Sequence, residues 1–241
     1  MDYFALGGIL IRELDIPTLI EKHRIFCEQW NIHYSLHSTK IRGRRQSFAW
    51  LAADPEIENR FHADLEQMLL SLPVIAMACV VDRSGYMARY QEMHGGEPWL
   101  MCKTAFAILV ERACKYVEMQ DGTLEIFFEQ AGKAEDTDIK KYIRLLKTEG
   151  MPFDKTNSAH YRAMEAERFT KIVRGDPREK TKKFPPIQIA DLVLYPMIKG
   201  GYDPSYPPYV NLVAGKMLID AHVSEDLKAA MGIKYFCFPP K

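Results

Sequence analysis

Apolar runs and apolar stripes at helical spacing mark the elements in the first third of the chain. Residues 3–11 and 74–81 are short apolar runs, a pattern typical of strands, and Gly7-Gly8 in the first run predicts a bulge or a close backbone approach. Apolar residues recur every three or four positions after Pro17 and after Pro55, and proline is common in the first turn of a helix. The pattern therefore predicts a strand, two amphipathic helices and a second strand covered on both faces.

The middle of the chain predicts a strand–helix–strand unit. The second strand ends at Asp82, where a turn is expected, and residues 99–120 are apolar almost throughout, as in a long helix packed on most of its circumference. Residues 123–129 then alternate like a strand. A crossover helix of this length makes the two strands parallel, so Asp82 and Glu129 should lie on the same edge of one sheet. A narrow polar stripe remains on the helix: Thr104, Glu111, Lys115 and Glu118.

The last hundred residues hold two further helices and a final strand. Residues 136–149 and 187–195 have helical patterns, and residues 233–238 have the composition of a strand. Residues 171–184 form the least foldable stretch, with six basic residues against two acidic ones. Residues 201–241 are rich in proline and tyrosine and form a C-terminal extension. Together these elements predict an α/β protein with a mixed sheet flanked by helices.

Composition narrows the class of protein. The 241 residues carry 32 Lys and Arg against 32 Asp and Glu, so attraction to nucleic acid or an anionic membrane has to be local. No apolar stretch reaches the ~20 residues of a membrane-spanning helix, and the start at Met1 lacks a basic segment, so a cytoplasmic protein is expected. The five cysteines include no Cys-x-x-Cys pair, which argues for reduced thiols rather than a disulfide framework or a zinc knuckle.

Asp191 is the most unusual acidic residue. Within an otherwise apolar helix, only Gln188 and Asp191 are polar, and their spacing of three places them on one face. An aspartate near a core is costly unless it is paired or bound to a metal, which predicts a functional role. The alternative is a structural aspartate that favours the helix dipole.

The carboxylates predict a divalent cation. If Asp191 meets Glu129 at the sheet edge, the pair suits Mg²⁺ or Mn²⁺, which bind oxygen ligands together with phosphate oxygens. Asp82 is the expected third ligand, and Glu125 and Glu111 are weaker candidates. Such a site is typical of metal-dependent phosphodiester hydrolysis.

His37 opens a segment suited to phosphate. Ser38 and Thr39 offer hydroxyl groups, and the basic residues that follow have no acid among them. We expect His37 to be catalytic, as a proton-transfer group, and Ser38, Lys40, Arg42 and Gln188 to bind substrate; a solvated loop is the alternative. No P-loop, Gly-x-Gly-x-x-Gly, Gly-x-Ser-x-Gly or His-Glu-x-x-His motif occurs. The basic residues are Lys40, Arg42, Arg44 and Arg45.

The order of several segments resembles one family. Five segments carry the resemblance: residues 4–11 with Leu-Gly-Gly, Leu36-His37-Ser38, Val80-Val81-Asp82, Phe128-Glu129, and residues 187–193 with Gln-x-Ala-Asp-Leu. Their order resembles that of the domain-of-unknown-function 3800 family, which is mostly bacterial and phage-associated. The resemblance spans nearly the whole chain. It implies a single RNase H-like domain over 1–241, with 31–73 as a helical insertion and 201–241 as an extension. It also implies a metal-dependent nuclease-like core in which Glu129 and Asp191 supply acids.

One departure from that family divides the functional hypotheses. Members usually begin with a strand bearing Asp-Glu-Ser-Gly, whereas in this chain only Asp2 precedes the Leu-Gly-Gly strand. Three explanations are open: the start codon is placed too late, the chain is a natural truncation that has lost catalysis, or Asp2 is a poor substitute for the missing acid. The first hypothesis is therefore a metal-dependent nuclease or phosphodiesterase that the missing strand could inactivate. The second is a non-catalytic protein that binds nucleic acid or another protein in phage or mobile-element biology. A missing strand would also expose a sheet edge and favour a homodimer. A third is a small-molecule phosphatase or hydrolase on an unrelated sheet.

Overall fold

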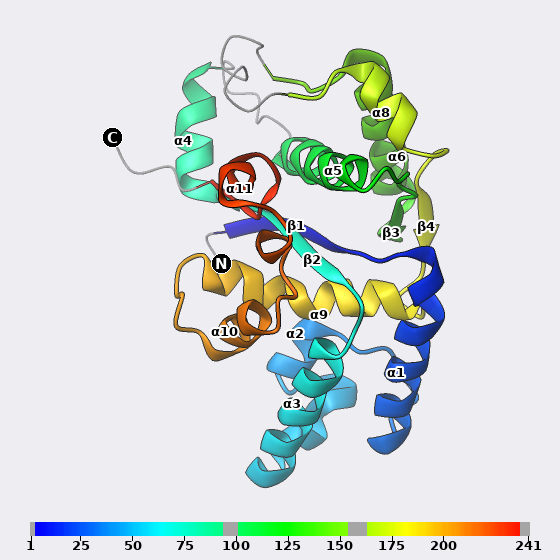
Figure 1. Ribbon diagram of the computed structural model, residues 1–241. Helices are drawn as coiled ribbons and strands as arrows, with labels where there is room; N and C mark the ends of the chain where they lie inside the picture. The colour runs from blue at the N-terminus through cyan, green and yellow to red at the C-terminus, as the bar shows by residue number, and fades with distance from the viewer. Residues whose placement is uncertain (1–2, 94–100, 154–162, 237–241) are drawn as a thin grey trace. The chain divides into compact units, whose positions relative to one another are not determined.

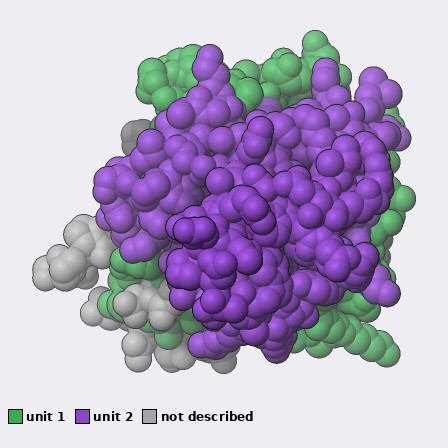
Figure 2. Space-filling view, turned by 90° about the horizontal axis from the view of Figure 1, so that it is seen from below, with its two compact units in different colours: residues 1–7, 77–180, 219–241 green, residues 8–76, 181–218 purple. Residues whose placement is uncertain are grey.

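A computed structural model describes residues 3–93, 101–153 and 163–236 (Figure 1). The chain divides into two compact units, coloured separately in Figure 2. Unit 1 is made of residues 1–7, 77–180 and 219–241, and unit 2 of residues 8–76 and 181–218. Helices predominate among the described elements, and the described strands are mostly short. Because helices and strands are both present, the predicted α/β class is confirmed. Asp2 and the ends of the segments expected at 99–120 and 233–238 lie outside the described residues.

The first sheet has the strand order β1-β2-β5. Its strands are β1 (Tyr3–Leu10), β2 (Ile75–Asp82) and β5 (Lys234–Phe236), which confirms the strands predicted at 3–11 and 74–81 and the described part of the one at 233–238. β2 and β5 are parallel, with Val80 opposite Tyr235. The six inner residues of β2 are buried, as expected of a strand covered on both faces. At Gly8 in β1 a Cβ atom would meet nothing within 4 Å, so of the bulge or close backbone approach predicted at Gly7-Gly8, a close approach is absent at Gly8.

The second sheet overturns the predicted sheet edge. β3 is only Phe127–Glu129, and it pairs in parallel with β4 (Arg178–Lys180) rather than with the first sheet. The expectation that Asp82 and Glu129 end strands of one sheet is therefore wrong. β4 also lies in the stretch expected to be least foldable. Its basic side chains find partners there, because the Arg178 guanidinium and the Lys180 ammonium lie over the ring of Phe127, at 4.6 and 5.4 Å from its centroid.

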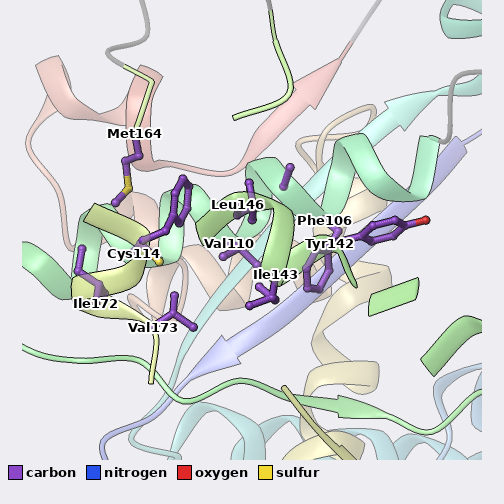
Figure 3. Close-up of a cluster of buried hydrophobic side chains, with 11 residues drawn as sticks. Phe106, Val110, Cys114, Tyr142, Ile143, Leu146, Met164, Ile172 and Val173 are labelled. Atoms are coloured by element: carbon purple, nitrogen blue, oxygen red, sulfur yellow. The ribbon is translucent and has the colours of Figure 1, made fainter. Parts of the chain in front are cut away.

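Helix α5 (Met101–Met119) is buried on its apolar face and also at Thr104, Glu111 and Lys115 of its polar stripe, whereas Glu118 is half-buried. Lys115 Nζ lies 3.0 Å from Glu111 Oε1, which also accepts a hydrogen bond of 2.9 Å from the Met164 amide. A buried charge is tolerated only when it is paired in this way. The helix packs against α6 (Lys133–Glu149) and α8 (Ala166–Ile172) through the buried cluster of Figure 3.

Two shorter helices complete the described part of unit 1. α4 (Arg83–Met93) follows β2 directly, where only a turn was expected. The Asp82 carboxylate explains this helix start, since Oδ1 accepts a hydrogen bond of 2.9 Å from the Gly85 amide. α11 (Glu225–Met231) packs on α5 and is preceded by the short helix η4 (Ile219–Ala221).

Unit 2 is mostly helical in its described part, although residues 8–10 of β1 and 75–76 of β2 belong to it. It holds the predicted insertion 31–73 and residues 201–218 of the predicted extension. The helices expected after Pro17, after Pro55 and at 187–195 are all present. Helix α9 lies against α1, α2 and α10 (Figure 1). None of the helices in the described ranges is both long and apolar enough to cross a bilayer. The elements of unit 2 are η1 (Glu13–Asp15), α1 (Ile16–Gln29), α2 (Ser38–Arg42), η2 (Gln46–Ala52), α3 (Pro55–Leu70), α9 (Pro185–Gly200) and α10 (Pro207–Ala214).

Candidate functional site

Helix α9 presents its two polar side chains to the segment that precedes α2. Pro185 and Pro186 begin the helix, and the buried residues Ile189 and Val193 fix it in the core of unit 2. Asp191 is then left half-buried, with 22% of its side chain exposed. The apolar pattern that predicted the helix therefore also decides which way this carboxylate faces.

Three nitrogen atoms converge on a single oxygen of Asp191. Oδ2 accepts a hydrogen bond of 2.9 Å from the Ser38 amide, and Lys182 Nζ lies 3.0 Å away. His37 Nδ1 lies 3.3 Å from the same oxygen. The His37 side chain is 33% exposed, so a ligand can reach its ring. The carboxylate thus binds an ammonium, an imidazole and a backbone amide from two distant stretches of the chain.

Gln188 repeats this arrangement one helical turn earlier. Its Oε1 atom accepts a hydrogen bond of 2.7 Å from the Leu36 amide, and His23 Nε2 lies 3.0 Å from it. Gln188 and Asp191 thus bind amides two residues apart, which requires the extended backbone seen at His37, with φ −145° and ψ 114°. Residues three apart in a helix lie on one face, and residues two apart in an extended segment point the same way, so the two side chains of α9 can meet the two amides. Gln188 thus anchors the backbone of the loop, and its predicted role in substrate binding stays a prediction.

His23 holds the Gln188 side chain in place. An amide oxygen only accepts hydrogen bonds, so His23 Nε2 carries the ring proton and donates a hydrogen bond to Gln188 Oε1. Burial lowers the pKa of His23, and the ring is therefore neutral near pH 7. Cys27 Sγ lies 3.8 Å from the ring nitrogens, and burial raises the pKa of its thiol to about 11. Cys27 is a free cysteine, in keeping with the reduced thiols expected from the sequence.

The predicted basic residues give the site a net positive charge. Arg42 is exposed, its guanidinium carbon lies 3.4 Å from the centroid of the Tyr195 ring, and its Nε donates a hydrogen bond of 3.3 Å to Ser38 Oγ. Lys40 is half-buried on the same short helix, whereas Arg44 is turned to Glu58, at 2.7 Å. Ser38 therefore joins two parts of the site, because its amide binds Asp191 and its hydroxyl binds Arg42.

The other predicted acids lie in unit 1, where each has a structural surrounding of its own. Asp82 caps α4, and Glu129 is exposed on β3 opposite Lys180. Glu125 forms an ion pair with Arg178, and Glu111 forms one with Lys115. The metal-binding and catalytic roles expected for Asp82 and Glu129 stay predictions.

Lys182 was not singled out from the sequence, although its Nζ lies closer to Asp191 Oδ2 than His37 Nδ1 does. It was counted only as one of the six basic residues of 171–184. A turn and the first turns of α9 separate it from Asp191, and no periodic pattern spans such a connection. Its signal was indirect: a lysine just before a helix that carries an unexplained aspartate.

The residues around Asp191 do not fit a divalent cation. The oxygen that would bind the metal already has the Lys182 ammonium at 3.0 Å, and this positive charge would repel the ion. Across the described ranges, no three His, Cys, Asp or Glu side chains come together as a metal would require. The predicted dependence on Mg²⁺ or Mn²⁺ therefore stays a prediction.

The molecule is thus an α/β protein with a cationic, imidazole-bearing site on its second unit. No family model matches the chain, and no solved structure matches it. It is 33% identical over 240 residues to uncharacterized protein y4pM of Sinorhizobium fredii, an alignment that covers 98% of this chain and 85% of that protein. The chain belongs to the same family as this relative.

Proposed function

We propose that the chain binds phosphodiesters of nucleic acid at the Asp191 site of unit 2 and hydrolyses them. The observation that supports this most is the convergence of Lys182 Nζ, His37 Nδ1 and the Ser38 amide on Asp191 Oδ2. With Lys40 and Arg42 nearby on α2, cations outnumber the one carboxylate. Such a surface suits an anionic substrate whose oxygens accept hydrogen bonds.

The chemistry would rest on the histidine. In hydrolysis a water oxygen attacks phosphorus, the bond to the leaving oxygen breaks, and one proton passes from the water to the leaving group. A neutral imidazole can take this proton and return it, and the adjacent Asp191 stabilises the imidazolium in between. Lys182 and Arg42 would stabilise the added negative charge on the phosphoryl oxygens.

Hydrolysis of bis(p-nitrophenyl) phosphate and of a fluorescent single-stranded oligonucleotide tests the proposal. Assays run in EDTA, in Mg²⁺ and in Mn²⁺ also test the metal dependence predicted from the sequence. His37→Ala should abolish turnover, whereas the exposed His33, replaced in the same way, serves as the matched control. Turnover that is equal in both variants would overturn the catalytic role of His37.

The non-catalytic hypothesis predicts a different result in the same assay. Salt-sensitive binding of the oligonucleotide without cleavage under any metal condition would support it over hydrolysis. Lys182→Gln should weaken that binding, and the neighbouring exposed residue Lys183, replaced by Gln, should not. Absence of any phosphodiester binding by the native chain would overturn both hydrolysis and nucleic-acid binding, and only the protein-binding form of the second hypothesis would remain.

Three finer expectations belong to the same proposal and rest on the sequence alone. An RNase H-like fold is supported by the segments shared with the domain-of-unknown-function 3800 family. A homodimer through an exposed sheet edge and a cytoplasmic location, where nucleic acid is at hand, complete the picture. Sedimentation of the purified chain at several concentrations tests the dimer directly.

A further inference from the structure

Arg42 and Tyr195 form a stacked pair beside the phosphate site. The guanidinium carbon lies 3.4 Å from the centroid of the ring, which is a face-to-face distance for two planar groups. Tyr206 packs edge-on against Tyr195, with ring centroids 6.1 Å apart and an interplanar angle of 89°. Burial raises the pKa of Tyr206, so that this ring stays un-ionised and supports Tyr195 from the side.

Arg42 is an exposed residue, and Tyr195 covers one face of its guanidinium. A ligand that stacks on this group therefore has to approach the other face. The Arg42 Nε hydrogen bond of 3.3 Å to Ser38 Oγ holds the plane in place. A guanidinium fixed in this way offers a flat surface of the kind on which nucleobases stack.

Ser38 connects this flat surface to the proposed phosphate site. Its hydroxyl binds Arg42 and its amide binds Asp191, the residue that Lys182 and His37 contact. A planar platform and a cationic group joined through one residue match the two parts of a nucleotide, a base and its phosphate.

We infer that Arg42, stacked on Tyr195, is a base-stacking site for single-stranded nucleic acid, adjacent to the phosphate site; this inference rests on the proposed function. A paired base is enclosed by its neighbours in a duplex and cannot reach such a platform. The substrate class is therefore single-stranded, and sequence preference is weak, because every base has a face that can stack.

Fluorescence anisotropy with two probes tests the inference. One probe is a 5′-labelled thymidine 12-mer, roughly the length that a nucleic-acid-binding domain covers, and the other is an abasic strand of equal length. The native chain should bind the thymidine strand about tenfold more tightly than the abasic strand. Arg42→Lys keeps the charge but removes the plane, so it should bind both probes as weakly as the native chain binds the abasic one. Tyr195→Leu, which removes the support, should have the same effect.

Arg60→Lys is the matched control, because Arg60 also lies over an aromatic ring of unit 2, at 5.2 Å from the centroid of Trp30. It should keep the preference for the thymidine strand. Equal binding of both probes by the native chain overturns the inference and leaves the proposed function standing. Loss of the preference in Arg60→Lys but not in Arg42→Lys overturns it as well. Failure to bind either probe overturns the proposed function itself.

Discussion

Lys182 Nζ lies 3.0 Å from Asp191 Oδ2, so the segment before α9 and the second turn of that helix form an ion pair. The Lys182 and Asp191 side chains are only 17% and 22% exposed, and solvent screens such a pair less than one at the surface. The ammonium therefore neutralises the Asp191 carboxylate.

The first prediction concerns the stability of this ion pair. Lys182→Gln leaves a half-buried carboxylate without its ammonium, and we expect the free energy of unfolding to fall by about 1 kcal/mol. Urea denaturation of the native chain and the variant measures this difference. Lys183→Gln, at an exposed neighbouring position, should change stability by less than about 0.5 kcal/mol. Equal losses in the two variants would contradict the pairing.

The second prediction concerns Gln188, which satisfies two donors at once. Gln188→Met keeps the shape but removes the oxygen that accepts from the Leu36 amide and from His23, both buried. Leaving two buried donors unsatisfied should cost about 2–4 kcal/mol of unfolding free energy. Thermal and urea denaturation provide the measurement. Gln67→Met on the exposed side of α3 is the control, and a similar loss there would argue against the anchor.

The third prediction concerns pH. Because burial lowers the pKa of His23, the unfolded chain binds more protons than the folded chain between the folded pKa and the ordinary value of 6.5. The contribution of His23 to stability is therefore complete above about pH 6.5 and is lost as the pH falls toward the folded pKa. His62, whose pKa burial also lowers, acts in the same direction. Between pH 7.5 and pH 5.5, the melting temperature of His23→Gln should fall by less than that of the native chain. An unchanged slope would show that His23 does not titrate as the buried site requires.

The fourth prediction concerns Gly200 at the end of α9. A Cβ atom at this position would lie 2.1 Å from Cγ of the Tyr209 ring, so Gly200→Ala should destabilise the chain by about 1–3 kcal/mol. Denaturation of the double variant with Tyr209→Ala should show less than additive losses, because the clash is gone. Gly8→Ala, where nothing lies within 4 Å, is the matched control. A larger loss at Gly8 than at Gly200 would contradict this packing.

The sequence predicted the elements of the fold better than their pairing. Apolar periodicity placed α1, α3, α5, α6 and α9, and apolar composition placed β1 and β2, because one face of an element can be read locally. The partner of β3 could not be read in this way. β3 is three residues long and pairs with Arg178–Lys180. All three residues of that segment are charged, a composition that does not indicate a strand.

The candidate site was predicted in part for the same reason. Asp191, His37 and Ser38 stood out through local anomalies of composition, and the structure brings all three together. Lys182 did not, because a lysine in a charged stretch is usually solvated. On α5 the polar residues Glu111 and Lys115 form an ion pair inside the core. Pairing between distant charges is a property of the folded chain that no local pattern reports.

The division of the chain into alternating segments has a consequence for its synthesis. Unit 2 takes residues 8–76 from the first third of the chain and 181–218 from its last quarter, with most of unit 1 translated in between. Helix α9 supplies Gln188 and Asp191 to the loop at residues 36–38, so that loop has no anchor while the ribosome is still making the middle of the protein. Nascent chains shorter than about 218 residues lack part of both units, and a chaperone that holds residues 8–76 during this interval would act on an incomplete core.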